Sequence, residues 1–121
     1  MKKIFLALSV AVAALLSAAC TKDKPNDNLG LQLYSIRAEC SKDIDAALQG
    51  TADAGYTIVE AASYDNAQGT FYGMAPKAFA DLCAAKGLNF LSSHINGPDP
   101  NVASEEECMA WWTKAIADHK A

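Results

Sequence analysis

The chain has 121 residues, of which 51% are hydrophobic, and a formal net charge of −4. Removal of an N-terminal leader, described below, takes away Lys2 and Lys3 and leaves 8 basic and 14 acidic residues, a net charge of −6. A domain with this excess of acidic residues repels nucleic acid, whose phosphates carry charge of the same sign. Nucleic acid is therefore not expected as a partner.

Residues 1–19 have the three parts of a secretory signal peptide: "MKK" is basic, "IFLALSVAVAALL" is apolar and "SAA" is a small-residue cleavage site. A transmembrane helix is the alternative, because the run from Ile4 to Ala19 is predominantly apolar. Its 16 residues fall short of the roughly 20 that span a bilayer. We therefore expect a signal peptide and an exported protein.

Small residues directly before a cysteine, as in "LSAAC", resemble the lipobox of bacterial lipoproteins, in which Cys20 is the lipidated residue. Ser17 departs from the leucine that is usual at its position. The following "TKDKPNDN" is polar and suits a flexible tether, so residues 20–28 are interpreted as lipidated cysteine and tether. We expect a periplasmic or cell-envelope lipoprotein that meets the membrane only through this lipid; plain secretion is the alternative.

Three further cysteines, Cys40, Cys83 and Cys108, have spacings that match no zinc or CxxC redox pattern. Their number is odd, so at least one is unpaired within the chain. Buried, small apolar side chains are the favoured interpretation, and one disulfide is the alternative.

The rest of the chain reads as three strands, each followed by a helix. Alternating apolar residues predict strands at 29–35, 56–62 and 88–93. The first helix begins at Ser41 or Asp43, and its apolar face consists of Ile44, Ala47, Leu48, Thr51 and Ala52. Gly55 stands where a helix-terminating glycine belongs.

Pro76 suits the first turn of the second helix, whose buried face is Phe79, Leu82 and Cys83 and which ends at Gly87. A loop at 63–73 precedes this helix, and a second loop at 94–103 follows the third strand. Ser104 and Glu107 have capping-box spacing at the start of the third helix. One helical stripe there combines Cys108, Trp111, Trp112, Ala115, Ile116 and His119.

Alternating strands and helices predict an α/β fold with a parallel sheet. Each unit takes roughly 30 residues, and an eight-unit barrel takes about 250. The predicted fold is thus the N-terminal part, about three βα units, of a (β/α)8 TIM barrel with helices on the outer face. Alternation within each strand then assigns Leu31, Leu33, Val59 and Leu91 to the helix side. It assigns to the interior Gln32, Tyr34, Ile58, Glu60, Phe90, Ser92 and His94.

All three strands end in polar residues on the interior side, and the carboxyl ends of parallel strands are where such folds place their sites. The chain resembles, in addition, the sugar phosphate isomerase/epimerase family of xylose-isomerase-like barrels, in particular its secreted bacterial members. The likeness rests on "LGLQLYSIR", "ALQGTADAGYTIVEAA", "FYGMAPKAFADLCAAKGL", "LSSHI" and "WWTKAIADHKA". Residues 29–121 are therefore interpreted as a partial xylose-isomerase-like barrel. Ala75 departs from the capping serine that is usual before Pro76.

The resemblance implies an enzyme that moves a proton between carbons next to a sugar carbonyl, with a divalent metal ion as cofactor and a small carbohydrate as substrate. Glu60 and His94 are the catalytic candidates, because proton abstraction from carbon requires a positioned base. Gln32, Tyr34 and Ser92 are the substrate-binding candidates. The family's principal metal ligands lie on later strands, so no residue of this chain is assigned to the metal. We expect the truncated chain to be inactive alone.

Each candidate has a structural alternative. Glu60 could serve only to pair with neighbouring groups, and Tyr34 or Gln32 could merely fill the barrel interior. His119 and the two tryptophans are interpreted as packing residues. A non-catalytic carbohydrate-binding or interaction module of the cell envelope is the alternative function. A metal-dependent phosphodiesterase of the same barrel type is disfavoured by charge and export.

Overall fold

A computed structural model describes residues 29–120. The predicted signal peptide, Cys20 and the tether at 20–28 lie outside the described residues. The described elements run in the order β1 (Gly30–Gln32), η2 (Leu33–Ile36), α2 (Arg37–Lys42), α3 (Ile44–Asp53), β2 (Ile58–Ala61), β3 (Tyr64–Asp65), β4 (Thr70–Phe71), α4 (Pro76–Ala85), β5 (Asn89–Ser93) and α5 (Glu105–His119). No helix among them is long and apolar enough to cross a membrane.

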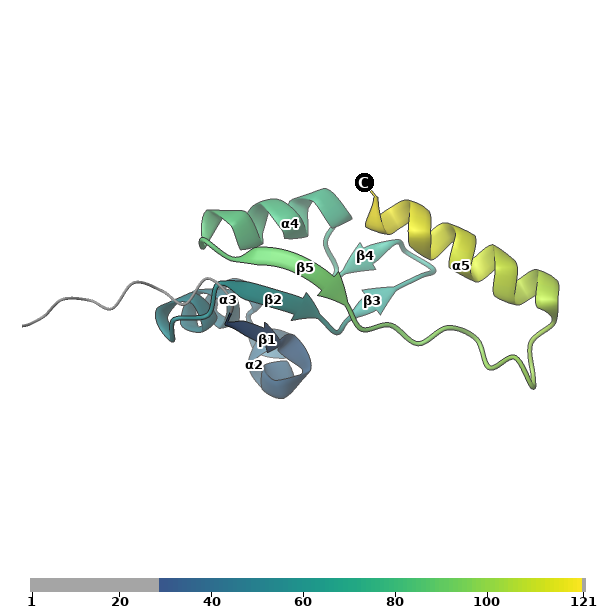
Figure 1. Ribbon diagram of the computed structural model, residues 1–121, viewed down its shortest axis with the longest axis horizontal. Coiled ribbons are helices and arrows are strands. Elements are labelled where there is room, and N and C mark those ends of the chain that lie inside the picture. Colours follow the sequence, from purple (N-terminus) through teal and green to yellow (C-terminus); the bar gives the residue numbers. More distant parts are fainter. Residues whose placement is uncertain (1–28, 121) are drawn as a thin grey trace, which may run out of the picture.

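Three parallel strands form the sheet, as the alternating pattern predicts. They are β1 (Gly30–Gln32), β2 (Ile58–Ala61) and β5 (Asn89–Ser93), in the spatial order β1-β2-β5. All three point in one direction, and α4 (Pro76–Ala85) lies along β5 (Figure 1). The fold is α/β, with helices on one side of a parallel sheet, as in part of a (β/α)8 barrel.

The helix boundaries follow the sequence signals closely. The side chain of Asp43 accepts a hydrogen bond from the Ala46 backbone N–H at the start of α3 (Ile44–Asp53). Gly55 after α3 and Gly87 after α4 have φ values of 91° and 75°, a region in which an L side chain is strained. Ala75, at the N-cap of α4, makes no side-chain cap, as its identity predicts.

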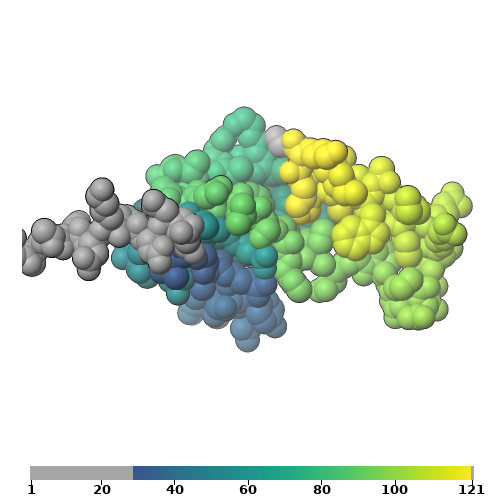
Figure 2. Space-filling view, in the orientation of Figure 1, coloured from purple at the N-terminus to yellow at the C-terminus, as the bar shows by residue number. Residues whose placement is uncertain are grey.

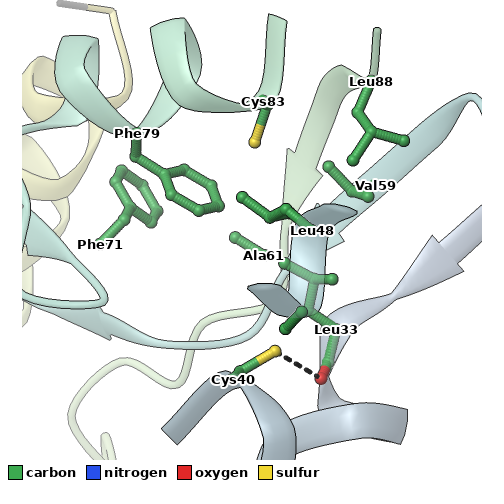
Figure 3. Close-up of a cluster of buried hydrophobic side chains, with 10 residues drawn as sticks. Leu33, Cys40, Leu48, Val59, Ala61, Phe71, Phe79, Cys83 and Leu88 are labelled. Carbon is green, nitrogen blue, oxygen red and sulfur yellow. Dashed lines mark hydrogen bonds between the residues drawn. The ribbon is translucent and has the colours of Figure 1, made fainter. Parts of the chain in front are cut away.

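An apolar core lies between the sheet and the helices (Figure 3). Val59 and Ala61 of β2 face Leu48 of α3 and Phe79 and Cys83 of α4, and all five side chains are fully buried or nearly so. The predicted outward orientation of Val59 and the predicted faces of α3 and α4 are confirmed. The opposite side of the sheet carries Ile58 and Glu60, which are only half-buried.

The first strand is shorter than predicted. Leu33–Ile36 forms the 3-10 helix η2, and Arg37–Lys42, predicted as a connection, forms the short helix α2. Leu33 still reaches the core, but from η2, where the Cys40 thiol donates to its carbonyl oxygen at 3.8 Å. The alternation at 29–35 does not distinguish a strand of this length from a shorter strand that ends in a tight helical turn.

The segment predicted as a loop at 63–73 contains a small antiparallel hairpin, β3 (Tyr64–Asp65) and β4 (Thr70–Phe71). Its Phe71 is completely buried, with its ring 5.8 Å from that of Phe79 and 5.4 Å from that of Phe90. This hairpin therefore closes one end of the core, a role that its polar composition conceals. Tyr72 follows with φ of 50°, and its hydroxyl accepts a hydrogen bond from the Ala62 backbone.

The predicted faces of β5 are wrong at two positions. Phe90 packs against the core and Leu91 is 66% exposed, whereas alternation assigned Phe90 to the interior and Leu91 to the helices. The cause is an irregularity in the pairing: Val59 lies opposite Phe90, but Glu60 lies opposite Ser92, so Leu91 is an extra residue. The irregularity restores Ser92 to the interior side that the sequence predicts.

Helix α5 (Glu105–His119) begins with the predicted capping box between Ser104 and Glu107. Together with the loop before it, α5 forms a lobe that extends beyond the carboxyl ends of the strands (Figures 1 and 2). Its predicted stripe is only partly covered, since Ala115 is buried but Trp112 is 40% and Ile116 is 53% exposed.

Contacts with the hairpin hold α5 in place. The Tyr64 hydroxyl donates to Asp118 at 2.7 Å, and the amide of Asn66 donates to the Trp111 carbonyl oxygen at 3.1 Å. The His119 ring lies 4.9 Å from the rings of both Tyr64 and Phe71. Trp111 and His119 are packing residues here, as the sequence predicts.

Cys40 and Cys83 are buried and Cys108 is half-buried, and all three thiols are free. Burial raises the pKa of Cys83 to about 11, so this thiol stays protonated and unreactive at neutral pH. The favoured interpretation of the cysteines as small buried residues holds for the described part of the chain, with Cys108 only partly covered.

Candidate functional site

Three polar side chains meet on the open side of the sheet, at the carboxyl ends of its strands. The parallel register places Gln32 of β1 opposite Glu60 of β2, and Glu60 opposite Ser92 of β5. Paired residues in parallel strands face the same side, so all three point away from the core. The structure thus brings together three of the five residues that the sequence singled out as catalytic or substrate-binding.

Hydrogen bonds join the three residues across the sheet. The Gln32 side-chain amide donates to Oε1 of Glu60, and the Ser92 hydroxyl donates to Oε2 of Glu60 at 2.7 Å. Both oxygens of one carboxylate are therefore held, each by a donor from a different flanking strand. We refer to Gln32, Glu60 and Ser92 together as the strand-end cluster.

The cluster favours the ionised form of its carboxylate. The hydrogen bond from Gln32, then that from Ser92, lowers the pKa of Glu60 below its ordinary value. The charge of His94 acts in the same direction, whereas partial removal from water opposes it. Glu60 is thus a carboxylate at neutral pH.

His94 follows β5 directly. Its backbone N–H donates to the Ala61 carbonyl oxygen at 2.8 Å, which continues the pairing of β5 with β2 by one residue. Its side chain is exposed and lies near enough to Glu60 for its charge to affect that carboxylate. The sequence-based placement of Glu60 and His94 at one edge of the sheet agrees with this geometry.

Tyr34 does not join the cluster. It lies in η2 rather than in a strand, its side chain is 55% exposed, and the Arg37 guanidinium lies 4.6 Å from the centre of its ring. The early end of β1 removes Tyr34 from the alternation that was expected to point it inward.

Ser93 is a residue that sequence reasoning did not single out. Its hydroxyl is buried and has no hydrogen-bond partner among the described residues. Ser93 pairs with Ala61, so it faces the side opposite to Ser92. The run of two serines before His94 gave no sign that one would face solvent and the other be buried without a partner.

The described residues do not form a metal site. No group of three or more His, Cys, Asp or Glu side chains in the range 29–120 could hold a metal ion. Glu60 and His94 supply two such side chains, fewer than the three protein ligands that a catalytic zinc site uses. By itself, the arrangement can accept hydrogen bonds from hydroxyl groups and exchange protons.

No family model and no curated protein matches the chain. Solved structures do match the chain. A sugar phosphate isomerase/epimerase from Parabacteroides distasonis ATCC 8503 matches with a TM-score of 0.65 and 30% sequence identity over 84% of this chain. A second sugar phosphate isomerase/epimerase structure from the same organism matches with a TM-score of 0.64 and 29% identity over 76% of this chain.

The resemblance to the sugar phosphate isomerase/epimerase family is confirmed. The chain spans 36% and 37% of the length of these two isomerase/epimerase chains, little more than one third. The exposed side chains of Gln32, Ser92 and His94 agree with this partial coverage, because ligand-binding sites in general are concave and need walls on several sides. Three strands provide one wall.

Proposed function

We propose that this chain is part of a sugar isomerase or epimerase that transfers a proton next to a sugar carbonyl. The observation that carries the proposal is the strand-end cluster, with His94 beside it, at the carboxyl edge of a parallel sheet. Barrel enzymes place their active sites at this edge. The similarity to two sugar phosphate isomerase/epimerase structures supports the same activity.

Glu60 and His94 are the proposed catalytic residues, because a carboxylate and an imidazole are the groups that most often accept and return protons in enzymes. Neighbouring strands lie about 4.8 Å apart, so one small sugar can reach both side chains. Gln32 and Ser92, and Tyr34 from the turn after β1, are the proposed contacts to the hydroxyl groups of the substrate.

A divalent metal ion belongs to this proposal as the cofactor of a complete barrel, in which it would stabilise negative charge on the carbonyl oxygen. The described residues offer no ligand set for such an ion. Their own contribution is limited to proton transfer and substrate contacts. We accordingly expect turnover only when the remaining strands are supplied, and none from this chain alone.

Export belongs to the same proposal. We place the protein in the periplasm or cell envelope, with lipid on Cys20 as its one attachment to the membrane. The substrate is then a small carbohydrate that reaches the cell envelope. Nucleic acid is not a proposed partner, because the part of the chain after residue 19 carries a net charge of −6.

The test is deuterium exchange. Residues 29–120 replace the matching segment of the Parabacteroides distasonis isomerase/epimerase, and the chimeric barrel is incubated with a panel of ketoses and aldoses in D2O with Mg²⁺ or Mn²⁺. We expect deuterium to appear at the carbon next to the carbonyl of one sugar, detected by NMR. Sugar binding without exchange would contradict the enzyme and support a non-catalytic carbohydrate-binding module. The absence of both sugar binding and deuterium exchange would contradict both functions.

A further inference from the structure

The carboxylate of Glu60 is held on both sides. Gln32 on one flanking strand donates to Oε1, and Ser92 on the other flanking strand donates to Oε2. Two donors from opposite sides fix the direction of the side chain and the plane of the carboxylate, as one donor could not. The arrangement also depends on the extra residue in β5, since regular pairing would have placed Leu91 opposite Glu60.

Such an arrangement suits a carboxylate that stays ionised. Hydrogen bonds to an ionised acceptor are stronger than those between neutral groups. A proton taken up by either oxygen would weaken the bond that this oxygen accepts. A general base has to take up a proton in every turnover, so the two donors work against that role. The carboxylate nevertheless keeps free lone pairs on both oxygens, because it offers about four acceptor positions and uses two.

We propose that Gln32 and Ser92 are positioning residues that hold Glu60 as a permanently ionised acceptor for a sugar hydroxyl, and that His94 carries the proton of the reaction. This inference rests on the proposed function and divides the roles within it. Glu60 orients the substrate and touches it. Gln32 and Ser92, proposed above as contacts to the substrate, also act through Glu60.

The proton step then balances within the substrate and one side chain. The C–H bond next to the carbonyl breaks, its proton passes to a ring nitrogen of His94, and its electron pair forms a carbon–carbon double bond while the π electrons of the carbonyl move to the oxygen, which gives an enediolate. For an isomerisation, the proton of the adjacent substrate hydroxyl passes to this oxygen, and the imidazolium returns the carbon-bound proton to the former carbonyl carbon.

The first experiment measures the charge of Glu60 without any turnover. The 121-residue chain is labelled with ¹³C at the glutamate carboxyl carbons, and Glu60 is identified by the loss of its signal in Glu60→Gln. We expect Ser92→Ala and Gln32→Leu each to raise the pKa of Glu60. Among the described residues, His94 is the titratable group whose charge acts on Glu60. The titrations are therefore repeated in His94→Ala to remove its effect.

Ser41→Ala is the matched control, because Ser41 is an exposed serine whose hydroxyl donates to the Arg37 carbonyl oxygen and not to Glu60. It should leave the titration of Glu60 unchanged. If Ser92→Ala and Gln32→Leu leave the pKa of Glu60 where it is in the unmodified chain, the positioning role is wrong.

The second experiment uses the chimeric barrel and separates Glu60 from His94 as proton carrier. Ser92→Ala raises the pKa of Glu60, so a base role for Glu60 would move the acid limb of the kcat/KM profile to higher pH by the same amount. We expect that limb to stay in place while KM rises roughly two- to tenfold, the effect of one weakened hydrogen bond. A limb that follows the pKa of Glu60 would overturn the assignment of His94. If the two substitutions raise the pKa of Glu60 as expected but the chimera shows no turnover, the proposed function is contradicted and the positioning of Glu60 is not.

Discussion

Replacement of Phe71 by alanine tests whether the β3–β4 hairpin is part of the core. The Phe71 side chain is completely buried, and its ring lies 5.3 Å from that of Tyr64, 5.8 Å from that of Phe79 and 5.4 Å from that of Phe90. Truncation of a buried phenylalanine typically costs about 3–5 kcal/mol, which combines the lost transfer energy with the cavity left behind. Three aromatic neighbours on different elements leave little opportunity for the cavity to collapse, so we expect a value in the upper half of that range.

Urea unfolding, followed by the fluorescence of Trp111 and Trp112, measures this cost. A domain of this size has a total stability of roughly 5–15 kcal/mol, so the variant should unfold at a much lower urea concentration. Val102→Ala is the control, since Val102 is 86% exposed and its loss should change stability by less than about 0.5 kcal/mol. A cost below about 1 kcal/mol for Phe71→Ala would show that the hairpin is a surface loop and not a wall of the core.

Three further predictions concern the helix caps, the hairpin contact and export. Asp43→Ala should lower the free energy of unfolding in urea by about 1 kcal/mol, because it removes the cap of α3. Ala75→Ser should raise it by at most about 1 kcal/mol, because it supplies a cap at the uncapped start of α4. Equal changes in the free energy of unfolding for both substitutions would contradict the capping assignment. Burial and the bond to Asp118 raise the pKa of Tyr64 from 10.0 to about 12. The contribution of Tyr64 to stability is therefore complete below pH 10 and declines as the pH rises towards 12. Tyr64→Phe should flatten the dependence of stability on pH in that window. The contact would be refuted if the variant and the unmodified chain had the same dependence. Cys20→Ser should release the protein from the membrane fraction, and a substituted protein that remains bound through an uncleaved N-terminus would contradict lipidation.

The sequence was sufficient for the parallel sheet and for most helix boundaries, because those features rest on local signals. Asp43, Pro76, Gly55 and Gly87 each determine a backbone conformation within one turn of the helix that they begin or end. Val59 was placed correctly because its strand is regular. The same regularity placed Gln32 beside Glu60, whereas Ser92 joins them only because β5 contains one extra residue.

The errors arose where a long-range contact overrides a local pattern. The extra residue Leu91 is invisible in the alternation of β5 and becomes evident only from the pairing with β2. Phe71 lies in a segment rich in polar residues and glycine, so nothing local distinguishes it from a solvent-exposed aromatic. Tyr34 was misplaced because β1 ends where η2 begins, at a point that the alternating pattern of residues 29–35 does not mark.

The most direct test of the proposed function is the turnover of the chimeric barrel after substitution of its two candidate catalytic residues. Glu60→Gln and His94→Ala should each lower kcat/KM for the exchanged sugar by roughly 10- to 1000-fold, the range that one positioned polar group contributes. Their melting temperatures should stay close to that of the parent, because both side chains lie at the open edge of the sheet and outside the core. Turnover within about twofold of the parent for His94→Ala, together with a melting temperature lower by several degrees, would contradict the account and make His94 a structural residue.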